Sequence, residues 1–217
     1  MSRRVDPSLI PHRPNLAFER ALWKQGIERV AGLDEAGRGA LAGPVFAAAV
    51  VLPSKGYVMN RLRGVRDSKE MTASEREKWA AKIEMVALGW GIGAAGAKEI
   101  DAYGIVPATR LGMQRALAQI EEEAGHLLID ALVLPEMATP QSKLLKGDQR
   151  SLSIAAASVL AKVARDAALK ALDSKYPGYG LGQHKGYGTK LHRGLIRQLG
   201  PSRIHRHSFR LSAADGD

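Results

Sequence analysis

Four acidic residues stand beside or within apolar segments, where an acid is unusual and needs an explanation. Two end a short apolar segment, one interrupts the apolar run at 126–134, and one precedes a long alanine-rich stretch: Asp34, Glu35, Asp130 and Asp148. Two carboxylates about 4 Å apart repel by about 4 kcal/mol at an effective dielectric constant of about 20. If the four converge, the folded protein must raise their pKa values or supply cations.

A carboxylate cluster in a chain without cysteine favours hard cations. The absence of cysteine excludes a disulfide framework, a cysteine–zinc site, an iron–sulfur cluster and a cysteine nucleophile. Oxygen ligands alone are typical of Mg²⁺ or Mn²⁺, and in a basic chain they fit two-metal chemistry on phosphodiesters. Structural roles stay open, since Asp148 also suits a helix N-cap and Asp34 a turn, whereas Asp130 is harder to explain in that way.

A glycine-rich turn, Gly37-Arg38-Gly39, follows the first acid pair. Its spacing matches neither GxxxxGK[ST] nor GxGxxG, which argues against a P-loop or a Rossmann nucleotide site. Glycines here would let the backbone approach a sugar or phosphate closely. A plain tight hairpin turn is an equal alternative.

The C-terminal part of the chain is strongly basic. No Asp or Glu occurs over 174–214, which carries eight Lys or Arg residues, four histidines and three tyrosines. Cations interleaved with aromatic rings are typical of a nucleic-acid groove, although a solvated basic face would explain the arginines as well. The histidines show no metal-binding spacing and are interpreted as polar or phosphate-facing.

The whole chain of 217 residues has a formal net charge of +10 and a pI of about 10.0. Such an excess indicates a polyanionic partner, with membrane surfaces and ribosomal RNA still open on charge alone. The N-terminus lacks the apolar stretch of a signal peptide, and the apolar segment 40–52 falls short of the roughly 18 residues of a spanning helix. We therefore expect a soluble, cytoplasmic protein.

The predicted elements alternate along the chain. Strands are predicted over 28–35, 45–52, 90–97 and 126–134, and helices after the capping box at 72–75 and over 107–123 and 151–172. The first two strands are joined closely enough to pair antiparallel. The order β-β-α-β-α-β-α predicts an α/β fold with helices packed on a mixed sheet.

Four sequence blocks together resemble the bacterial ribonuclease HII family, the type 2 ribonucleases H. They are GLDEAGRGALAGPV at 32–45, DSKEMT at 67–72, KGDQRSLSIAAASVLAKVARD at 146–166, and HKGYGTKLH with IHRHSF at 184–192 and 204–209. The resemblance implies a ribonuclease H-like, mixed five-stranded sheet flanked by helices, with a small helical C-terminal segment. We expect a polar N-terminal arm at 1–25, a catalytic domain at 26–175 and a basic substrate-binding segment at 176–217.

The resemblance also implies an activity. It implies hydrolysis of the RNA strand of RNA–DNA hybrids, and cleavage 5′ of ribonucleotides embedded in duplex DNA, leaving 3′-hydroxyl and 5′-phosphate ends. The implied cofactor is Mg²⁺ or Mn²⁺ at a two-metal site, and the implied partner is nucleic acid and not a membrane. The expected form is a monomer that acts in ribonucleotide removal and RNA primer removal.

Residue roles follow from the resemblance position by position. The metal-binding acids fall on the four acids above, the turn that senses the 2′-hydroxyl on Gly37, Arg38 and Gly39, and the tyrosine that packs on the sugar beside the junction on Tyr187. Positions near the phosphate backbone are Lys69, Lys146, Ser158, Lys162 and Lys185. Two positions depart from the pattern: Ala131, where relatives usually carry glycine, and Gly104, where an asparagine commonly opens a helix.

Two other classes of protein remain as alternatives. A non-catalytic RNA-binding or ribosome-associated module would explain the charge but not the paired acids or Asp130. Another nuclease or polynucleotidyl transferase of the same superfamily would differ in its response to a single 2′-hydroxyl.

Overall fold

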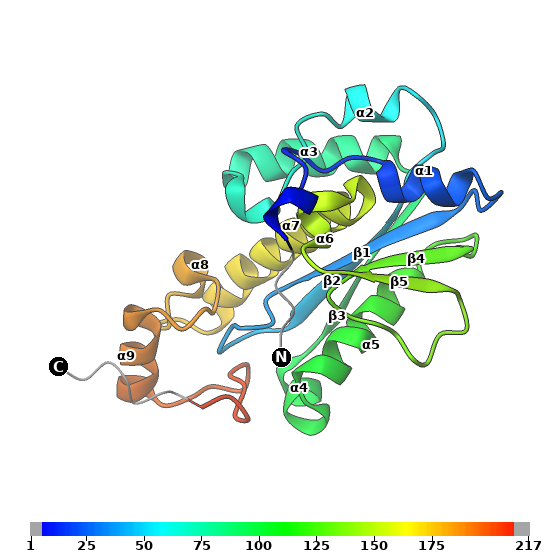
Figure 1. Ribbon diagram of the computed structural model, residues 1–217. Coiled ribbons are helices and arrows are strands. Elements are labelled where there is room, and N and C mark those ends of the chain that lie inside the picture. The colour runs from blue at the N-terminus through cyan, green and yellow to red at the C-terminus, as the bar shows by residue number, and fades with distance from the viewer. Residues whose placement is uncertain (1–5, 211–217) are drawn as a thin grey trace.

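The structure, a computed structural model, describes residues 6–210, and its centre is one mixed five-stranded sheet (Figure 1). The strands lie in the order β3-β2-β1-β4-β5. Their bounds are β1 Val30–Ala36, β2 Val45–Val51, β3 Gly89–Ala95, β4 His126–Asp130 and β5 Gln141–Leu144. The strands β1, β2 and β3 pair antiparallel, whereas β4 runs parallel to both β1 and β5. The mixed five-stranded sheet flanked by helices that the resemblance implies is confirmed.

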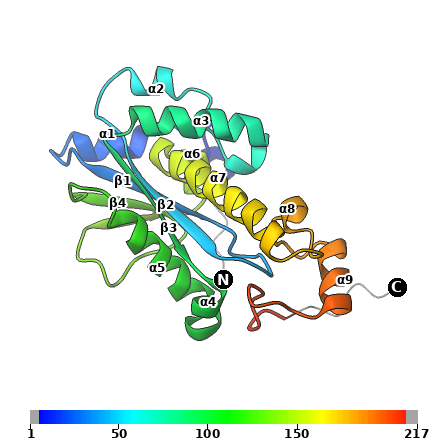
Figure 2. The same cartoon turned by 180° about the vertical axis from the view of Figure 1, so that it is seen from behind.

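Helices cover both faces of this sheet and extend beyond one end of it (Figures 1 and 2). On one face α7 packs on β1 and β2 and carries α3 on its outer side, while α5 packs on β2 and β3 from the other face. The helices are η1 Pro7–Leu9, α1 Ala17–Trp23, α2 Val58–Arg61, η2 Ser68–Glu70, α3 Ala73–Val86, α4 Ala97–Tyr103, α5 Ile105–Leu117, α6 Gly147–Arg150, α7 Leu152–Lys175, α8 Leu181–His184 and α9 Lys190–Leu199.

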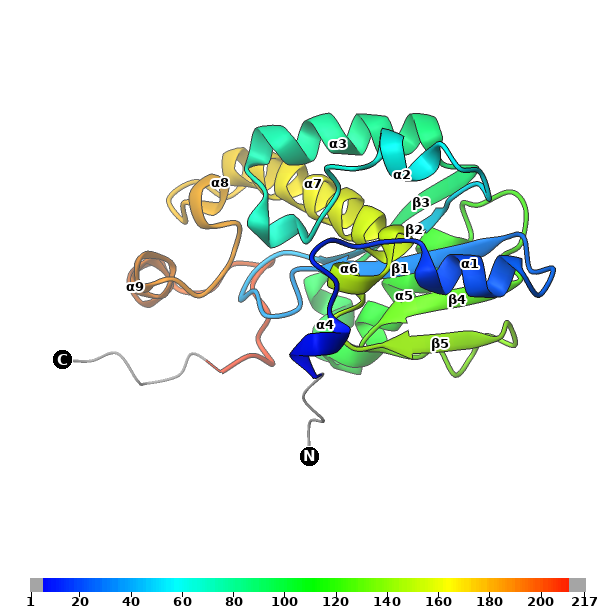
Figure 3. The same ribbon diagram turned by 45° about the horizontal axis from the view of Figure 1, so that its top comes forward.

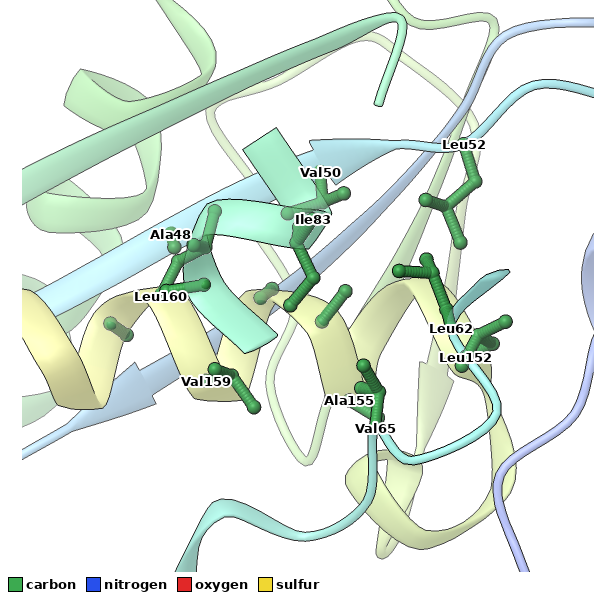
Figure 4. Close-up of a cluster of buried hydrophobic side chains, with 14 of the residues drawn as sticks. Ala48, Val50, Leu52, Leu62, Val65, Ile83, Leu152, Ala155, Val159 and Leu160 are labelled. Carbon is green, nitrogen blue, oxygen red and sulfur yellow. The ribbon is translucent and has the colours of Figure 1, made fainter. Parts of the chain in front are cut away.

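The side chains of β2 alternate between two buried clusters, as the period of a strand requires. Ala48 and Val50 pack toward α7, and Figure 4 shows them beside Leu160 and Ile83 in that cluster. Ala47, Ala49 and Val51 belong to the cluster on the α5 side. An unbroken apolar run therefore marks a strand that is buried on both faces.

Two glycines set how closely the helices approach the sheet. A β carbon on Gly32 of β1 would stand 2.3 Å from the carbonyl carbon of Ser153 in α7, and one on Gly93 of β3 would stand 2.1 Å from the carbonyl oxygen of Gly112 in α5. Only a residue without a side chain fits at either contact.

The apolar run predicted as a strand over 126–134 ends early, and this prediction is wrong in its second half. The strand β4 stops at Asp130 because Ala131 takes a left-handed backbone with φ of 50°. The helix predicted over 107–123 spans Ile105–Leu117. The fifth strand, β5, has only one buried residue along its length, so no apolar pattern marked it.

Part of the expected N-terminal arm packs on the sheet. Leu16 is buried beside α1, and Glu19 of α1 accepts hydrogen bonds from the hydroxyls of Ser151 and Ser153 at 2.7 Å. Residues 1–5 of that arm and 211–217 of the basic segment lie outside the described residues. Among residues 6–210, none of the helices has both the length and the apolar character that crossing a membrane requires.

Candidate active site

The four acids predicted from the sequence come from three segments that meet at one end of the sheet. The parallel pairing of β1 with β4 sets Leu33 opposite Ile129, so Asp34 and Asp130 follow at the same edge. Asp148 lies in α6, whose preceding loop is tied back to β4. The backbone N–H of Gly147 donates to Asp130 Oδ1 at 2.7 Å.

Burial and mutual repulsion perturb all four acids. Burial is the largest cause in each case. It raises the pKa of Asp34 well above its usual value, with further increases from Glu35, Asp130 and Asp148. The pKa of Asp130 rises to about 6, although the Gly147 N–H lowers it in part. The pKa values of Glu35 and Asp148 are also raised. These carboxylates therefore act on one another through space, as the sequence alone could not show.

Two cations face the cluster and compensate part of its charge. The Arg38 guanidinium donates to Glu35 Oε1 at 3.2 Å. The Lys69 ammonium lies 3.5 Å from Asp148 Oδ2 and 3.9 Å from Asp67 Oδ1. Burial lowers the pKa of Lys69, but the carboxylates around it outweigh burial and raise the pKa overall, so it carries its charge at neutral pH.

The donor set fits a hard divalent cation. The Oε2 atom of Glu35 is buried and has no hydrogen-bond partner within residues 6–210. Within the same residues, no group of three acidic or histidine side chains is arranged in the geometry of a metal-binding site. Instead, Asp34 Oδ1 accepts from the N–H of Glu35, and Asp130 Oδ1 from that of Gly147. Buried carboxylate oxygens with raised pKa values are the ligands whose charge a bound cation would relieve.

The glycine turn closes the β1–β2 hairpin beside the acids, and two buried arginines hold it in place. Arg206 donates to the carbonyls of Gly37, Arg38 and Gly43 at 2.8, 2.8 and 3.0 Å. Arg165, which is fully buried, donates to Pro44 O at 3.3 Å. Both guanidinium groups are thus used in shaping the protein.

This arrangement leaves the turn with hydrogen-bond donors to offer. The carbonyls of Gly37 and Arg38 accept from Arg206, while the backbone N–H groups of Arg38 and Gly39 donate no hydrogen bond within the described part of the chain. Gly37 has φ of 94°, a backbone that glycine adopts readily. The turn therefore presents amide N–H groups beside the acids and is more than a plain hairpin connection.

Tyr187 lies next to the same turn. It forms an isolated β-bridge with Ala40, and the residue is 37% exposed. The Arg165 guanidinium lies 5.0 Å from the centre of the Tyr187 ring, and Lys162 Nζ lies 5.9 Å from it. One face of the ring is thus supported by cations, and the exposed part is available to a ligand.

Two histidines behind Tyr187 form a buried hydrogen-bonded chain, and a third stacks against it. The backbone N–H of Ser202 donates to His205 Nδ1 at 2.9 Å, the His205 and His192 Nε2 atoms lie 3.2 Å apart, and His192 Nδ1 lies 3.0 Å from Tyr187 O. These contacts assign one direction, in which neutral His205 donates to neutral His192 and His192 donates to the Tyr187 carbonyl. The ring of His184 stacks on that of His192 at 4.1 Å between centroids. Interpreting these three histidines as phosphate-facing is wrong, since all three are buried.

The predicted phosphate-backbone residues are spread over several surfaces. Lys69 is exposed at the acids, and Lys146 lies two residues before Asp148. Lys162 pairs with Asp166 at 2.6 Å, and the Lys185 ammonium donates to Gly182 O. Ser158 is buried with its hydroxyl 2.9 Å from that of Ser68, and a hydrogen bond from Ser158 lowers the pKa of Asp34. Ser158 therefore lies behind the acids.

Sequence reasoning missed Arg165, Arg206 and Asp67. Asp67 caps η2 by accepting from the N–H of Lys69 at 3.0 Å and also accepts from the side chain of Gln149. In the sequence, Arg206 is one of the eight cations of the basic segment. No local signal distinguishes a buried structural arginine from a surface one when most of its partners are more than 100 residues away.

The two departures from the family pattern both fall on backbone with positive φ. Ala131 has φ of 50° and Gly104 has φ of 84°. Glycine adopts positive φ at the least cost, and the φ of 84° with ψ of 162° at Gly104 is essentially limited to glycine. Ala131 is therefore strained directly beside Asp130, whereas Gly104 is well suited to the junction of α4 and α5.

The chain is similar to known proteins over most of its length. A family model described as ribonuclease HII matches residues 31–212. A ribonuclease HII of Synechococcus sp. (strain JA-3-3Ab) is 54% identical over 197 residues, covering 91% of this chain and 88% of that protein.

Solved structures share the fold. The ribonuclease H2 of Pyrococcus horikoshii OT3 superposes with a TM-score of 0.69 at 27% identity, covering 84% of this chain and 94% of that one. Bst ribonuclease HIII in complex with Mn²⁺ superposes with a TM-score of 0.67 at 17% identity, covering 87% of this chain and 69% of that one. By its sequence and its fold, the chain belongs to the ribonuclease HII family and is a nuclease, a hydrolase of phosphodiester bonds.

Proposed function

We propose that this protein is an endoribonuclease that hydrolyses the RNA strand of RNA–DNA hybrids and cuts 5′ of ribonucleotides embedded in duplex DNA. Its products carry 3′-hydroxyl and 5′-phosphate ends. The proposal is carried by the closeness of three features: the buried acids, the turn with its free N–H groups and the exposed tyrosine. Asp34 lies near the end of β1 and Asp130 at the end of β4, and Tyr187 lies against the turn that presents the N–H groups of Arg38 and Gly39.

The four acids would hold divalent cations, Mg²⁺ or Mn²⁺. Asp34, Glu35, Asp130 and Asp148 supply the carboxylate oxygens that these ions prefer. When bound, a pair of such ions supplies activation of a water molecule and stabilisation of the departing 3′ oxygen. The Mn²⁺ in Bst ribonuclease HIII, a protein of the same fold, supports this choice of cation.

The glycine turn would recognise the ribose. A 2′-hydroxyl both donates and accepts hydrogen bonds, and it distinguishes RNA from DNA at a given nucleotide. The backbone N–H groups of Arg38 and Gly39 are suitable donors to it, because Arg206 holds the turn by its carbonyls. A rigid turn loses little entropy on binding, so its contact with one hydroxyl group can discriminate between sugars.

Tyr187 would pack on the neighbouring deoxyribose. Its ring is fixed from below by Arg165, and its backbone carbonyl by His192. Together with the turn, the ring would hold one phosphate over the acids. Lys69, Lys146, Lys162 and Lys185 would supply positive charge to the rest of the phosphate backbone.

In the cell, this activity would serve removal of ribonucleotides from DNA and of RNA primers. We place the protein in the cytoplasm as a monomer. The net charge of +10 suits a duplex with one phosphate per nucleotide.

The decisive experiment is cleavage of duplex DNA that contains one ribonucleotide, with Mg²⁺, Mn²⁺ or EDTA. A matched duplex without the 2′-hydroxyl is the substrate control, and Asp34→Asn is the protein control. We expect one cut 5′ of the ribonucleotide that requires the metal and Asp34. The proposal fails if no metal supports a cut, or if the all-DNA duplex is cut equally well.

A further inference from the structure

A cavity of about 330 Å³ lies beside the acids, where the N-terminal segment passes the loop between α2 and η2. It is lined by residues 10–14, residues 63–67, Glu70 and Gln149 of α6. Figure 3 shows the chain from η1 to α1 running past α6 at this place. The segment 10–14 precedes residue 31, where the match to the family model begins.

Three arginines line this cavity, and one has no protein partner. Arg66 donates to Glu70 O at 3.2 Å and to Glu75 Oε1 at 3.1 Å. Arg13 donates to the backbone carbonyl of Arg63 at 3.3 Å, which brings the two residues together. Within residues 6–210, the guanidinium of Arg63 makes no hydrogen bond or ion pair. Its donors are therefore not used by the described residues, and Arg63 borders both this cavity and the neighbouring pocket beside Trp79.

Two acidic residues also line the cavity, and the carboxylate of one already accepts hydrogen bonds from the protein. Asp67 is buried and accepts hydrogen bonds from the N–H of Lys69 and the side chain of Gln149. Glu70 is exposed, and its carboxylate has no partner among the described residues. The cavity thus has a positive excess, which Glu70 reduces.

Two residues that line the cavity, Asp67 and Gln149, are neighbours of the proposed active site. Gln149 follows Asp148 in the chain, and the Lys69 ammonium lies between Asp67 at 3.9 Å and Asp148 at 3.5 Å. A nucleic-acid strand placed over the acids carries a phosphate at each nucleotide and would present phosphates toward this cavity.

We propose that the cavity between residues 10–14 and 63–67 binds a phosphodiester of the duplex, with Arg63 as its main contact and Arg13 as its second. This inference rests on the proposed function, because it takes the substrate to be a nucleic acid. A planar guanidinium presents paired donors that match two phosphate oxygens. The cavity adds affinity away from the reacting bond.

The test measures binding of a fluorescent duplex with one ribonucleotide by anisotropy, in EDTA and at several NaCl concentrations. Arg63→Gln should bind 3- to 10-fold more weakly, and the slope of log affinity against log salt should fall by about 1. Glu70→Gln should bind about twofold more tightly, a gain that misfolding cannot produce. Arg20→Gln removes the same charge from an exposed site on α1 outside the cavity and should change affinity less than twofold.

Neutral methylphosphonates placed singly along both strands then locate the phosphate. We expect one position at which the substitution weakens wild-type binding but weakens Arg63→Gln no further. If instead inorganic phosphate binds in an Arg63-dependent way and no such position exists, the ligand is a free anion and the proposal is overturned. The proposal is also overturned if the Arg63, Glu70 and Arg20 variants behave alike while wild type cuts at the ribonucleotide. If wild type neither binds nor cuts that duplex, the proposed function itself fails.

Discussion

The guanidinium of Arg165 lies directly against Gly37: a β carbon on Gly37 would stand 1.9 Å from Arg165 Nε. The same guanidinium donates to Lys185 O at 2.9 Å and lies under the Tyr187 ring. One buried side chain of α7 therefore supports both the turn and the tyrosine that the proposed function uses. Arg206, also buried, fixes the carbonyls of the turn from the opposite end of the chain.

Gly37→Ala should destabilise the protein by about 2 to 3 kcal/mol. The added methyl group meets Arg165, and φ of 94° is strained for any residue with a side chain. Gly39→Ala is the matched control, because a β carbon there meets no atom within 4 Å. It should change the free energy of unfolding by less than about 0.5 kcal/mol. Urea unfolding measures the free energy of unfolding of both variants. Equal decreases would contradict the packing of Arg165 against Gly37.

Tyr187→Ala should reduce kcat/KM at a single embedded ribonucleotide by about tenfold or more. It should affect long hybrids less, because these present many equivalent sites. Removing an aromatic contact of this kind costs about 1 to 3 kcal/mol. Tyr187→Phe should retain activity, since the hydroxyl makes no hydrogen bond within residues 6–210. Equal losses on the two substrates would remove the junction-sensing role.

His192→Gln should change how stability depends on pH. Burial, followed by His184, lowers the pKa of His192 to about 4, so its neutral form is favoured in the folded state. A base whose folded pKa lies below its unfolded value of about 6.5 contributes stability above pH 6.5 and loses it as pH falls toward 4. The difference in unfolding free energy between wild type and His192→Gln should therefore shrink by about 1 to 3 kcal/mol over that range. A difference that is constant with pH would contradict the neutral chain from His205 to Tyr187.

Much of the fold could be predicted because its signals are local. The strands β1 and β2 follow apolar runs, and the capping box at Thr72 and Glu75 forms as expected at the start of α3. The strand β5 could not be found, because the segment Gln141–Leu144 has a largely polar sequence and lies at the edge of the sheet. The early end of β4 depends on one backbone angle at Ala131, which apolar periodicity does not report.

The four acids stand out in the sequence as anomalies, but only the topology of the sheet shows that they lie together. Asp34 and Asp130 lie at the same end of the sheet because β1 pairs in parallel with β4, which lies about 90 residues further along the chain. The supports of the turn were missed for the same reason. Arg165 and Arg206 look like solvated or phosphate-binding cations in the sequence, and only the folded chain shows that they bind carbonyls.

Ala131→Gly should stabilise the protein by about 0.5 to 1 kcal/mol. A left-handed backbone costs a residue with a β carbon about 1 to 2 kcal/mol, and the greater freedom of glycine in the unfolded state offsets part of that gain. The same substitution at Ala138, an exposed loop position without positive φ, should destabilise by about 0.5 kcal/mol. Urea unfolding measures the change in unfolding free energy of each variant. Changes of opposite sign would support backbone strain at Ala131, and changes of the same sign would contradict it.

Asp130→Asn should stabilise the metal-free protein at neutral pH. Burial raises the pKa of Asp130 from about 4 to about 6, so the folded state disfavours its charge. For an acid with a raised folded pKa, this cost is absent below about pH 4 and complete above about pH 6. Asparagine carries no charge, and its Oδ1 can still accept from the Gly147 N–H. We expect the free energy of unfolding in EDTA to rise by about 1 to 3 kcal/mol at pH 7.5 and to match wild type near pH 4.

The same variant separates electrostatic relief from cation binding. Mn²⁺ should raise the Tm of wild type at pH 7.5, because an ion bound only by the folded state stabilises it. The increase should be smaller in Asp130→Asn, which lacks one ligand charge. The Tm advantage of the variant over wild type in EDTA should therefore shrink or reverse as Mn²⁺ is added. An equal increase in both proteins would show that Asp130 does not hold the ion. A variant no more stable than wild type in EDTA would show that its carboxylate carries no charge penalty in the folded protein.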